Sequence, residues 1–341
     1  MSVPFLDGKN TRPRLLVVRR DAVGDLICTT PLFAALRAHF PGARICALVN
    51  TYNSVVLDDN PDVDRVFAFP NANHWPAGMT IREKYGEIRT VLTALRREKF
   101  DCVIHASRST SREDKIFGRL VGAGRLLRRN HDPEGAHEIV RTLSVLEPLG
   151  IKGTPAAPRV YPDRTKSRRA HAFLSASAAG PTPTAVHLSA RNTENQWPLA
   201  RYGEFLRSAV KEGGRFVVLW SPGASHNPGH PGDDEKAAVL RRELAGLPVA
   251  FWPTPTVTDL VATLAACSRF IGCDGGHCHV ASALPIPVLG LYCEKKIAEW
   301  RPWGEPHAVV GAKTVGDIRT DLVLAAYRQM PEAAPPPWLD T

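Results

Sequence analysis

Short apolar runs alternate with amphipathic stretches along the first half of the chain. The apolar runs predict strands at 15–18, 44–49, 65–69 and 102–105, and the amphipathic stretches predict helices at 31–40, 88–97 and 137–149. In the second of these helices Ile88, Val91 and Leu95 recur at a spacing that places apolar side chains on one helical face. Such alternation is typical of parallel sheets flanked by helices.

The pattern is interrupted between 152 and 184, where Pro, Ala, Ser and Arg are frequent and large apolar residues are few. It then resumes, with strands predicted at 185–188, 216–220, 270–272 and 288–292 and helices at 199–212, 234–245, 258–267 and 280–284. We therefore predict an α/β protein of two Rossmann-like, doubly wound domains that face each other across a central cleft. The first spans 1–178, the second spans 179–325, and a tail occupies 326–341.

Length and charge narrow the class of protein. A chain of 341 residues favours two domains, and a content of 44% hydrophobic and 23% charged residues is that of a globular protein. The net charge of +9 favours an acidic partner: nucleic acid, an anionic membrane surface or a phosphorylated substrate. Nucleic acid is the weakest of these, because no nucleic-acid-binding motif is present. Surplus arginine that only aids solubility explains the charge equally well.

Two features favour a cytoplasmic protein. Seven cysteines are scattered without a CxxC pair, mostly in apolar contexts, which is typical of reduced core thiols. Residues 1–14 contain no signal-peptide core, and no apolar run approaches the roughly 20 residues that span a bilayer. Any contact with the inner face of the plasma membrane is then expected to be peripheral, electrostatic and sensitive to salt.

Two glycine-bearing turns are the candidate binding elements. Asp274, Gly275 and Gly276 lie between a predicted strand and a helix-compatible segment. Glycine permits close backbone approach, and the N–H groups at a helix start favour an anion, so this turn is expected to bind phosphate. Gly24 and Asp25 form the second turn, again between a strand and a helix. Ligands of doubly wound domains bind at the carboxyl ends of the strands, where both turns lie.

Further short motifs follow these turns in a fixed order from about residue 15 to residue 304. The set is Gly24-Asp25 with Pro31, Phe40-Pro41-Gly42-Ala43, Gln196-Trp197-Pro198, Asp274-x-Gly276-x-x-His279, Pro287 and Trp300-Arg301-Pro302-Trp303-Gly304. The ordered set resembles glycosyltransferase family 9, the ADP-heptose:lipopolysaccharide heptosyltransferases. The resemblance implies a GT-B fold with an acceptor-binding N-terminal domain and a nucleotide-sugar-binding C-terminal domain. It also implies transfer with inversion and without a metal or another cofactor.

Asp25 is the candidate catalytic base. An inverting transfer needs a group that takes the proton from the acceptor hydroxyl as this oxygen attacks the anomeric carbon. The resemblance assigns that role to the aspartate of Gly24-Asp25. A helix-capping aspartate is the structural alternative. Asp21 is a neighbouring competitor, although the spacing to Pro31 favours Asp25.

The donor site is expected at Asp274, Gly275, Gly276 and His279. Backbone N–H groups of the turn and the imidazole of His279 would stabilise a leaving nucleoside diphosphate. The structural alternative is a tight turn with a capping aspartate and a core histidine. The cysteines and histidines between 273 and 279 have no zinc-binding spacing, so no metal site is expected.

The chain departs from the family at position 195. The resemblance implies a lysine there that contacts the donor, and this chain has Asn195, which keeps a hydrogen-bond donor but lacks the charge. Arg191, Lys295 and Lys296 are candidates to replace it; otherwise the donor differs or the activity is weak. Trp197 is equally interpretable as a donor contact or as part of the core.

Two further groups of residues are weaker candidates. Asp233 or Asp234 lies where an acidic side chain can bind a ribose hydroxyl, although helix capping is the simpler explanation. Basic residues between 106 and 129, among them Arg108, Arg112 and Lys115, are suited to acceptor phosphates or acidic sugars. A solvated charged face is the alternative for this second group.

We therefore predict an inverting, metal-independent GT-B glycosyltransferase that transfers heptose from ADP-heptose to an acidic, lipid-linked lipopolysaccharide inner-core acceptor. No cofactor and no nucleic acid are expected. Two alternatives stay open. One is the same fold with a different nucleotide-sugar donor or with a protein or small-molecule acceptor. The other is a non-catalytic, nucleotide-binding assembly protein.

Overall fold

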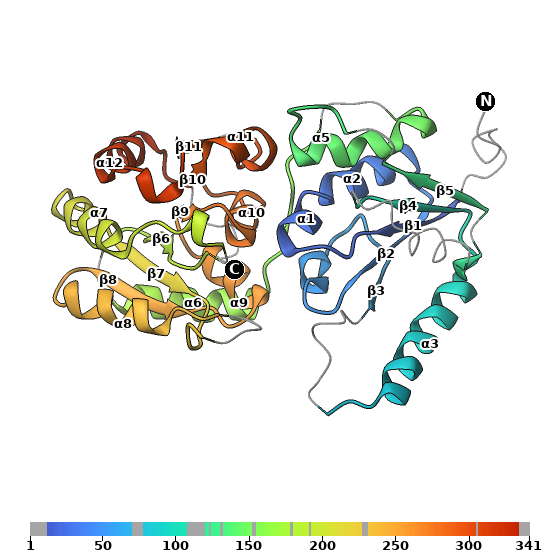
Figure 1. Cartoon of the computed structure of the whole chain (residues 1–341), viewed down its shortest axis with the longest axis horizontal. Helices are drawn as coiled ribbons and strands as arrows, with labels where there is room; N and C mark the ends of the chain where they lie inside the picture. The colour runs from blue at the N-terminus through green and yellow to red at the C-terminus, as the bar shows by residue number, and fades with distance from the viewer. Residues whose placement is uncertain are drawn as a thin grey trace. The chain divides into compact units, whose positions relative to one another are not determined.

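The computed structural model describes residues 12–69, 78–107, 120–122, 124–129, 132–151, 155–177, 180–190, 192–226, 231–304 and 306–333. The chain forms two compact units that divide between Pro158 and Arg159, and each contains a parallel sheet flanked by helices (Figure 1). The division precedes the boundary expected after residue 178. The reason is α6 (Arg164–Ser177), which packs on α9 (Val257–Leu264) within the second unit.

The first unit contains a five-stranded sheet in the order β3-β2-β1-β4-β5. Its strands are β1 (Arg14–Val18), β2 (Arg44–Asn50), β3 (Arg65–Phe69), β4 (Cys102–His105) and β5 (Arg125–Arg128). Its helices are α1 (Val23–Ile27), α2 (Thr30–His39), α3 (Ile81–Glu98) and α5 (Glu138–Leu143), with 3-10 helices η2 (Ser54–Leu57) and η4 (Ser144–Leu149). In central β1, Leu16 lies opposite Cys46 of β2 and Val103 of β4. β1 therefore ends in the middle of the sheet edge, where the turn containing Asp25 begins.

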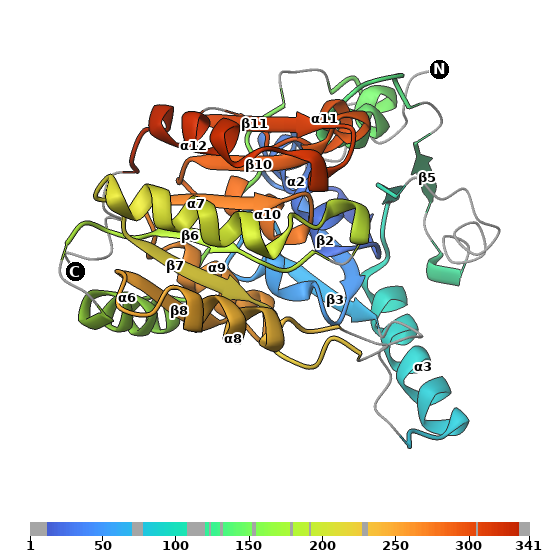
Figure 2. The ribbon, with the colours of Figure 1, turned by 60° about the vertical axis from the view of Figure 1, so that its left-hand side comes forward.

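Helix α3 begins at Ile81, before the predicted start at residue 88. Thr80 and Glu83 form a capping box, in which the Thr80 hydroxyl accepts the Glu83 N–H at 3.3 Å and the Glu83 carboxylate accepts the Thr80 N–H at 2.7 Å. This cap stabilises two turns that have no buried face, since Ile81 and Tyr85 are both exposed. The start of α3 consequently extends beyond the sheet of the first unit (Figure 2).

The second unit contains a six-stranded sheet in the order β11-β10-β9-β6-β7-β8. Its strands are β6 (Thr184–His187), β7 (Phe216–Trp220), β8 (Val249–Pro253), β9 (Arg269–Cys273), β10 (Val288–Cys293) and β11 (His307–Ala312). Its other helices are α7 (Leu199–Lys211), α8 (Asp234–Glu243), α10 (Gly276–Ser282), α11 (Glu294–Trp300) and α12 (Thr320–Gln329), with 3-10 helices η5 (Thr193–Asn195) and η6 (Val315–Asp317). Strands β6, β9 and β10 are neighbours, so the segments that follow them rise from adjacent positions on one sheet edge.

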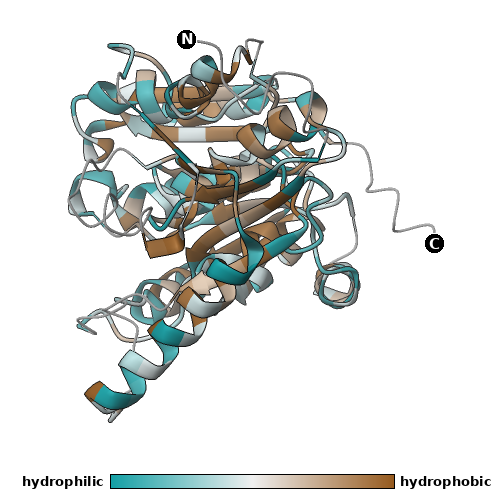
Figure 3. Cartoon of the chain, turned by 90° about the vertical axis from the view of Figure 1, so that its right-hand side faces the viewer, coloured by the Kyte–Doolittle hydropathy of each residue, from teal (hydrophilic) through white to brown (hydrophobic). Residues whose placement is uncertain are grey.

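One large core supports that sheet. Helices α7, α8 and α12 cover one face, and their apolar side chains pack on β6, β7, β9 and β10 (Figure 2). Phe205 of α7 is at the centre, with its ring 5.8 Å from that of Phe216 and 5.6 Å from that of Tyr327. Figure 3 shows the apolar residues concentrated in the strands, whereas the helices have both apolar and polar positions. Burial of both sheet faces therefore explains the continuous apolar runs of the central strands.

Three edge strands, β5, β8 and β11, are missed by the sequence prediction, as are helices α11 and α12. The edge strands are mostly half-buried, since each has a neighbour on one side only. β5 begins and ends with arginine and gives no continuous apolar run, whereas β8 and β11 contain short apolar runs, at 249–252 and 308–310, that the prediction did not assign to strands. The strands predicted at the centres of both sheets are confirmed within one or two residues at each end.

Candidate functional site

The turn after β1 is organised by a buried arginine. Arg19, which follows Val18, is 2% exposed, and its guanidinium forms ion pairs with Asp21 at 3.0 Å, Asp25 at 2.8 Å and Glu138 at 2.9 Å. Burial lowers the pKa of Arg19, but the three surrounding carboxylates outweigh it and leave the pKa raised. Arg19 is therefore a permanent cation that fixes the position of the carboxylates around it.

Asp25 is both a capping residue and a partly accessible carboxylate. Its Oδ1 accepts from Nη2 of Arg19, and its Oδ2 accepts from the backbone N–H of Ala22 at 3.0 Å, before the first turn of α1. The side chain nevertheless remains 21% exposed. The capping alternative is thus correct as a description of one oxygen, and it is compatible with a chemical role for a carboxylate that has further lone pairs.

Glu138 completes this group from a distant segment. It is the first residue of α5, and its Oε1 accepts from Arg19 and also from Nη1 of Arg129 at 2.6 Å. Burial raises the pKa of Glu138, but Arg19 and Arg129 outweigh that effect and hold it below its usual value. Asp132 pairs with Arg129 at 2.6 Å on the outer side. The turn that contains Asp25 is consequently connected to α5 by ion pairs, in which Glu138 lies between Arg19 and Arg129.

Asp21 differs from Asp25 in its environment. Burial raises the pKa of Asp21, although Arg19 opposes the shift. The backbone carbonyl of Asp21 accepts from Tyr52 Oη at 2.7 Å and from Asn53 Nδ2 at 3.0 Å, so the loop is held at this residue as well. Both carboxylates therefore lie in the same turn, and Asp21 remains a competitor for the role of base.

The turn after β9 is shaped by a stacked pair of histidine rings. The rings of His187, at the end of β6, and His277, in α10, stack with centroids 4.2 Å apart and planes 7° from parallel. Burial lowers the pKa of His277 to about 4 and that of His187 well below its usual range, so both rings are neutral at pH 7. A Cβ atom on Gly275 would lie 2.8 Å from the His277 ring. Glycine at 275 thus permits the turn to pass directly over this ring.

Asn195, Asp274 and Lys296 meet beside this turn, and we call them the donor cluster. Asn195 Nδ2 donates to Asp274 Oδ2 at 2.9 Å, and Lys296 Nζ donates to Asn195 Oδ1 at 3.1 Å. Lys296 Nζ also lies 3.3 Å from Asp274 Oδ2. Asn195 is buried, whereas Lys296 is 24% exposed. A cation, a carboxylate and an amide are therefore placed together at the carboxyl ends of β6, β9 and β10.

A family model described as glycosyltransferase family 9 (heptosyltransferase) matches residues 118–319, which is more than half of the chain. The chain belongs to glycosyltransferase family 9. It is 24% identical over 305 residues to lipopolysaccharide heptosyltransferase 3 of Escherichia coli strain K12, with 83% of each chain covered.

Two solved structures show the same fold. The family 9 glycosyl transferase of Veillonella parvula superposes with a TM-score of 0.79 at 16% identity, over 96% of this chain and 98% of that chain. The E. coli heptosyltransferase WaaC with ADP superposes with a TM-score of 0.75 at 18% identity, over 93% and 99%. The predicted family, the glycosyltransferase class and the two-domain GT-B fold are confirmed.

Within this family 9 member, two predicted donor residues are buried beside the turn. His279 lies in α10 with its ring 5.8 Å from that of Trp300, and its backbone N–H donates to Gly275 O at 3.4 Å. Trp197 belongs to the core of the second unit, where its indole N–H donates to Ile318 O at 2.9 Å. This placement favours packing over a donor contact for Trp197.

The structure gives the contacts of two further candidate residues, Asp233 and Asp234, and does not describe four others. Both carboxylate oxygens of Asp234 serve the loop after β7, since they accept from Trp220 Nε1 at 2.7 Å and from Gly223 N at 2.9 Å. Asp233 pairs with Lys236 at 2.6 Å. Four residues lie outside the described part of the chain, so their predictions stay open: Arg108, Arg112, Lys115 and Arg191.

The sequence prediction missed Arg19, which binds Asp25, and Glu138, which binds Arg19. Arg19 directly follows the strand predicted at 15–18 and Glu138 lies in the helix predicted at 137–149, and neither was assigned a role. A charged residue directly after a buried strand is the signal for Arg19, because such a side chain needs charged partners. No comparable signal identifies Glu138, since its partner lies 119 positions away.

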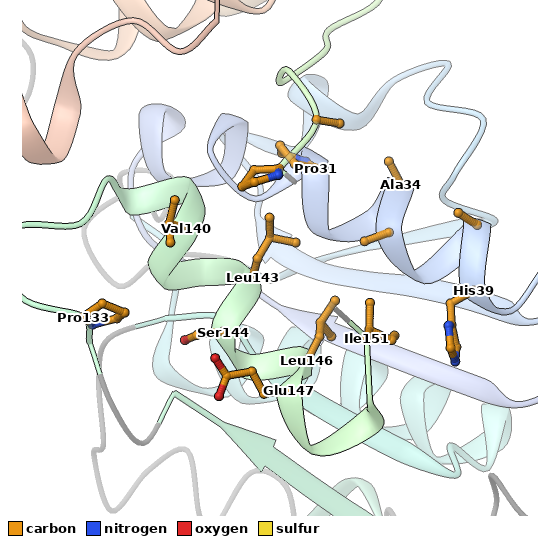
Figure 4. A pocket seen from close by; sticks show the side chains of 14 residues that line it. Pro31, Ala34, His39, Pro133, Val140, Leu143, Ser144, Leu146, Glu147 and Ile151 are labelled. Carbon is orange, nitrogen blue, oxygen red and sulfur yellow. The ribbon is translucent and has the colours of Figure 1, made fainter. Parts of the chain in front are cut away.

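A cavity of about 710 Å³ lies between α2 and the α5–η4 segment, and Asp25 is not among its lining residues (Figure 4). Its lining is mainly apolar, with Ala34 on one side and Leu143, Leu146 and Ile151 on the other. Across the described ranges, no group of three or more His, Cys, Asp or Glu side chains is arranged to bind a metal ion. No helix in those ranges is long and apolar enough to cross a bilayer.

Proposed function

We propose that this family 9 glycosyltransferase transfers a heptose from ADP-heptose to an acidic lipopolysaccharide inner-core acceptor, by an inverting displacement that needs no metal. The observation that supports it most directly is the partial exposure of Asp25 beside a buried arginine. Its carboxylate is partly exposed, while the arginine that holds it is almost completely buried. A base for glycosyl transfer needs this combination, because it must meet the acceptor without losing its orientation.

In the proposed reaction the acceptor oxygen attacks the anomeric carbon of the donor from the face opposite the diphosphate. The new carbon–oxygen bond forms as the bond to the β-phosphate oxygen breaks, and the bonding electron pair leaves with the diphosphate. The proton of the acceptor hydroxyl passes to Asp25. Arg19 orients the carboxylate of Asp25 through one oxygen before the step, and the Ala22 N–H orients it through the other.

The donor is assigned to the second unit. The donor cluster and the backbone of the Asp274–Gly276 turn are suited to a nucleoside diphosphate, because they present N–H groups and an ammonium at one sheet edge. A relative of the same fold is described with ADP, which supports an adenine nucleotide here. Relatives named as lipopolysaccharide heptosyltransferases support the heptose and the acceptor.

The acceptor is assigned to the first unit. A net charge of +9 suits an acidic, lipid-linked glycan, and Arg108, Arg112 and Lys115 are the proposed contacts to its phosphates or carboxylates. We place the enzyme in the cytoplasm, with an electrostatic contact to the inner face of the plasma membrane. That contact weakens as salt rises, because it depends on screened charges.

The test measures turnover of a panel of nucleotide sugars with a lipopolysaccharide acceptor that lacks the heptose. Release of the nucleoside diphosphate is the quantity that is measured. ADP-heptose is expected to be the best donor. Asp25→Asn should lower kcat about 10²- to 10⁴-fold while the Kd for ADP stays unchanged. Asp21→Asn is the matched control and should change kcat much less.

Two results would contradict the proposal in different ways. Turnover with another nucleotide sugar and none with ADP-heptose would replace the donor and keep the reaction class. ADP binding without turnover of any donor, and full cellular function of Asp25→Asn, would indicate a nucleotide-binding assembly protein instead of an enzyme.

A further inference from the structure

We propose that Lys296 is the side chain that binds the diphosphate of the donor. The inference rests on the proposed function, because it assigns contacts within the donor site of the second unit. It selects Lys296 from the candidate cations named from the sequence and places it, from a helix that the sequence did not predict, in the site expected at the Asp274 turn and at position 195.

The sheet brings the donor cluster together. Asn195 follows β6, Asp274 follows β9, and Lys296 lies in α11 directly after β10. These strands are adjacent, with β9 in the middle, and the Asp274 N–H continues the ladder by donating to Leu291 O at 3.0 Å. Three segments that are distant in sequence therefore converge at the carboxyl edge of one sheet, where ligands of such folds bind.

The position of Lys296 is defined by its two partners. Its ammonium is 3.1 Å from Asn195 Oδ1 and 3.3 Å from Asp274 Oδ2, and the side chain is only partly accessible. The preceding residue, Lys295, is 65% exposed and pairs with the exposed Glu194 at 3.0 Å. The two lysines of this short helix thus differ in environment, because Lys296 contacts Asn195 and Asp274 whereas Lys295 is exposed to solvent.

The ammonium has capacity left for a phosphate. A lysine has three N–H donors, and within the described structure two of them face Asn195 and Asp274. The third can bind a phosphate oxygen without release of either partner. The stacked rings of His187 and His277 supply no competing positive charge at pH 7, since burial keeps both neutral. Lys296 is accordingly the cation that the described contacts place at the turn.

Asp274 explains why the cluster suits a sugar nucleotide in particular. A lone carboxylate would repel a diphosphate, but Asp274 is paired with Lys296 and accepts from Asn195. Its remaining lone pairs can accept from sugar hydroxyls. A cation and a carboxylate 3.3 Å apart match a ligand in which a phosphate is joined to a polyol. The cluster therefore fits the bond that the transferase breaks.

This placement assigns Lys296 a role in catalysis as well as in binding. When the bond between the anomeric carbon and the β-phosphate oxygen breaks, the electron pair stays on that oxygen, and negative charge on the diphosphate increases. An ammonium in contact with the phosphate stabilises the increased charge more than the starting charge. Loss of Lys296 should then lower kcat in addition to weakening the donor.

The experiment compares Lys296→Ala with Lys295→Ala, which removes the same charge from the same helix. Calorimetric titration of ADP and UDP is combined with steady-state kinetics and thermal unfolding of each variant. Lys296→Ala is expected to bind the preferred nucleoside diphosphate about 10- to 100-fold more weakly, with a lower kcat and an unchanged Tm. Lys295→Ala should stay within about twofold of wild type, because exposed pairs contribute little.

A second variant separates charge from shape. Asn195→Lys in the Lys296→Ala background returns an ammonium to the cluster, since the two side chains are within hydrogen-bonding distance in the wild-type protein. It should restore at least part of the lost affinity. No recovery would show that the loss came from a disturbed Asp274, and it would overturn the assignment.

Equal binding by Lys296→Ala and wild type, or an equal loss in Lys295→Ala, would also overturn it. Failure of the proposed donor is distinguishable from these outcomes. A wild-type preference for UDP would replace ADP-heptose, and the loss in Lys296→Ala, measured with UDP, would still decide the role of the lysine. Wild type that binds neither ADP nor UDP would contradict both proposals.

Discussion

Arg19 and Glu138 form an ion pair of 2.9 Å between Nη2 and Oε1, although 119 positions separate them in the sequence. The same nitrogen of Arg19 binds Asp25. The turn that contains the proposed base is therefore held in place by the start of α5. Because the ion pair with Glu138 fixes the guanidinium of Arg19, it also fixes the orientation of Asp25.

Glu138→Gln should destabilise the protein and slow the reaction. The substitution leaves Arg19 and Arg129 without their shared anion in a buried site, which is expected to cost about 3 kcal/mol in the free energy of unfolding. Chemical denaturation measures this effect, and kcat should fall while the Kd for ADP stays constant. Asp321→Asn is the control, because the Arg319–Asp321 pair is exposed and its loss should have no measurable effect. An unchanged unfolding free energy in Glu138→Gln would show that the pair has no structural role.

The stability of the wild type should depend on Glu138 in acid. The net effect of its surroundings lowers its folded pKa below the ordinary value of 4.5, so folding favours the ionised form. The resulting stability is fully present above about pH 4.5 and is lost as pH falls through the folded pKa. Unfolding free energies from pH 7 down to pH 3 should therefore fall more steeply for wild type than for Glu138→Gln. Parallel curves for the two proteins would refute this assignment.

Gly275→Ala should disturb the donor turn. The added methyl group would lie 2.8 Å from the His277 ring, which cannot withdraw because it stacks on His187. We expect a loss of about 1 to 3 kcal/mol in stability and weaker binding of ADP. Gly86→Ala in α3 is the matched control, because a Cβ there meets nothing within 4 Å, and it should be neutral or slightly stabilising. Wild-type ADP affinity in Gly275→Ala would mean that the turn does not contact the nucleotide.

The cysteines should be unreactive in the folded protein. All seven are buried thiols, and burial raises the pKa of Cys273 to about 11 and that of Cys278 to about 12. Thiol titration at pH 8 should give slow modification of the native protein and seven fast-reacting thiols after denaturation. Rapid modification of any native thiol, located by mass spectrometry, would contradict the buried positions.

The fold was predictable where burial leaves a clear signal. Central strands such as β1 and β9 are buried on both faces, so their apolar runs identify them from the sequence alone. The edge strand β5 is mostly half-buried and begins and ends with arginine, so it leaves no such signal. The start of α3 depends on the capping box of Thr80 and Glu83, and apolar spacing alone does not locate it.

The candidate site was predictable where its residues lie in a local motif. Asp25 and Asp274 stand in turns between a strand and a helix, and both could be singled out for that reason. The contacts of Glu138 and Lys296 depend on the packing of segments more than 100 positions away from their partners at Arg19 and Asn195. Sequence spacing gives no information about such contacts, and Lys296 could be proposed only as one of several cations.

The convergence of Asn195, Asp274 and Lys296 has a consequence for folding. These residues come from segments up to 101 positions apart, and they meet only after β6, β9 and β10 have paired. The proposed nucleotide site is therefore expected to form late in the folding of the second unit, since long-range pairing forms slowly. A ligand that binds only the completed sheet draws the folding equilibrium toward it, so ample nucleotide sugar would protect the newly made chain from unfolding.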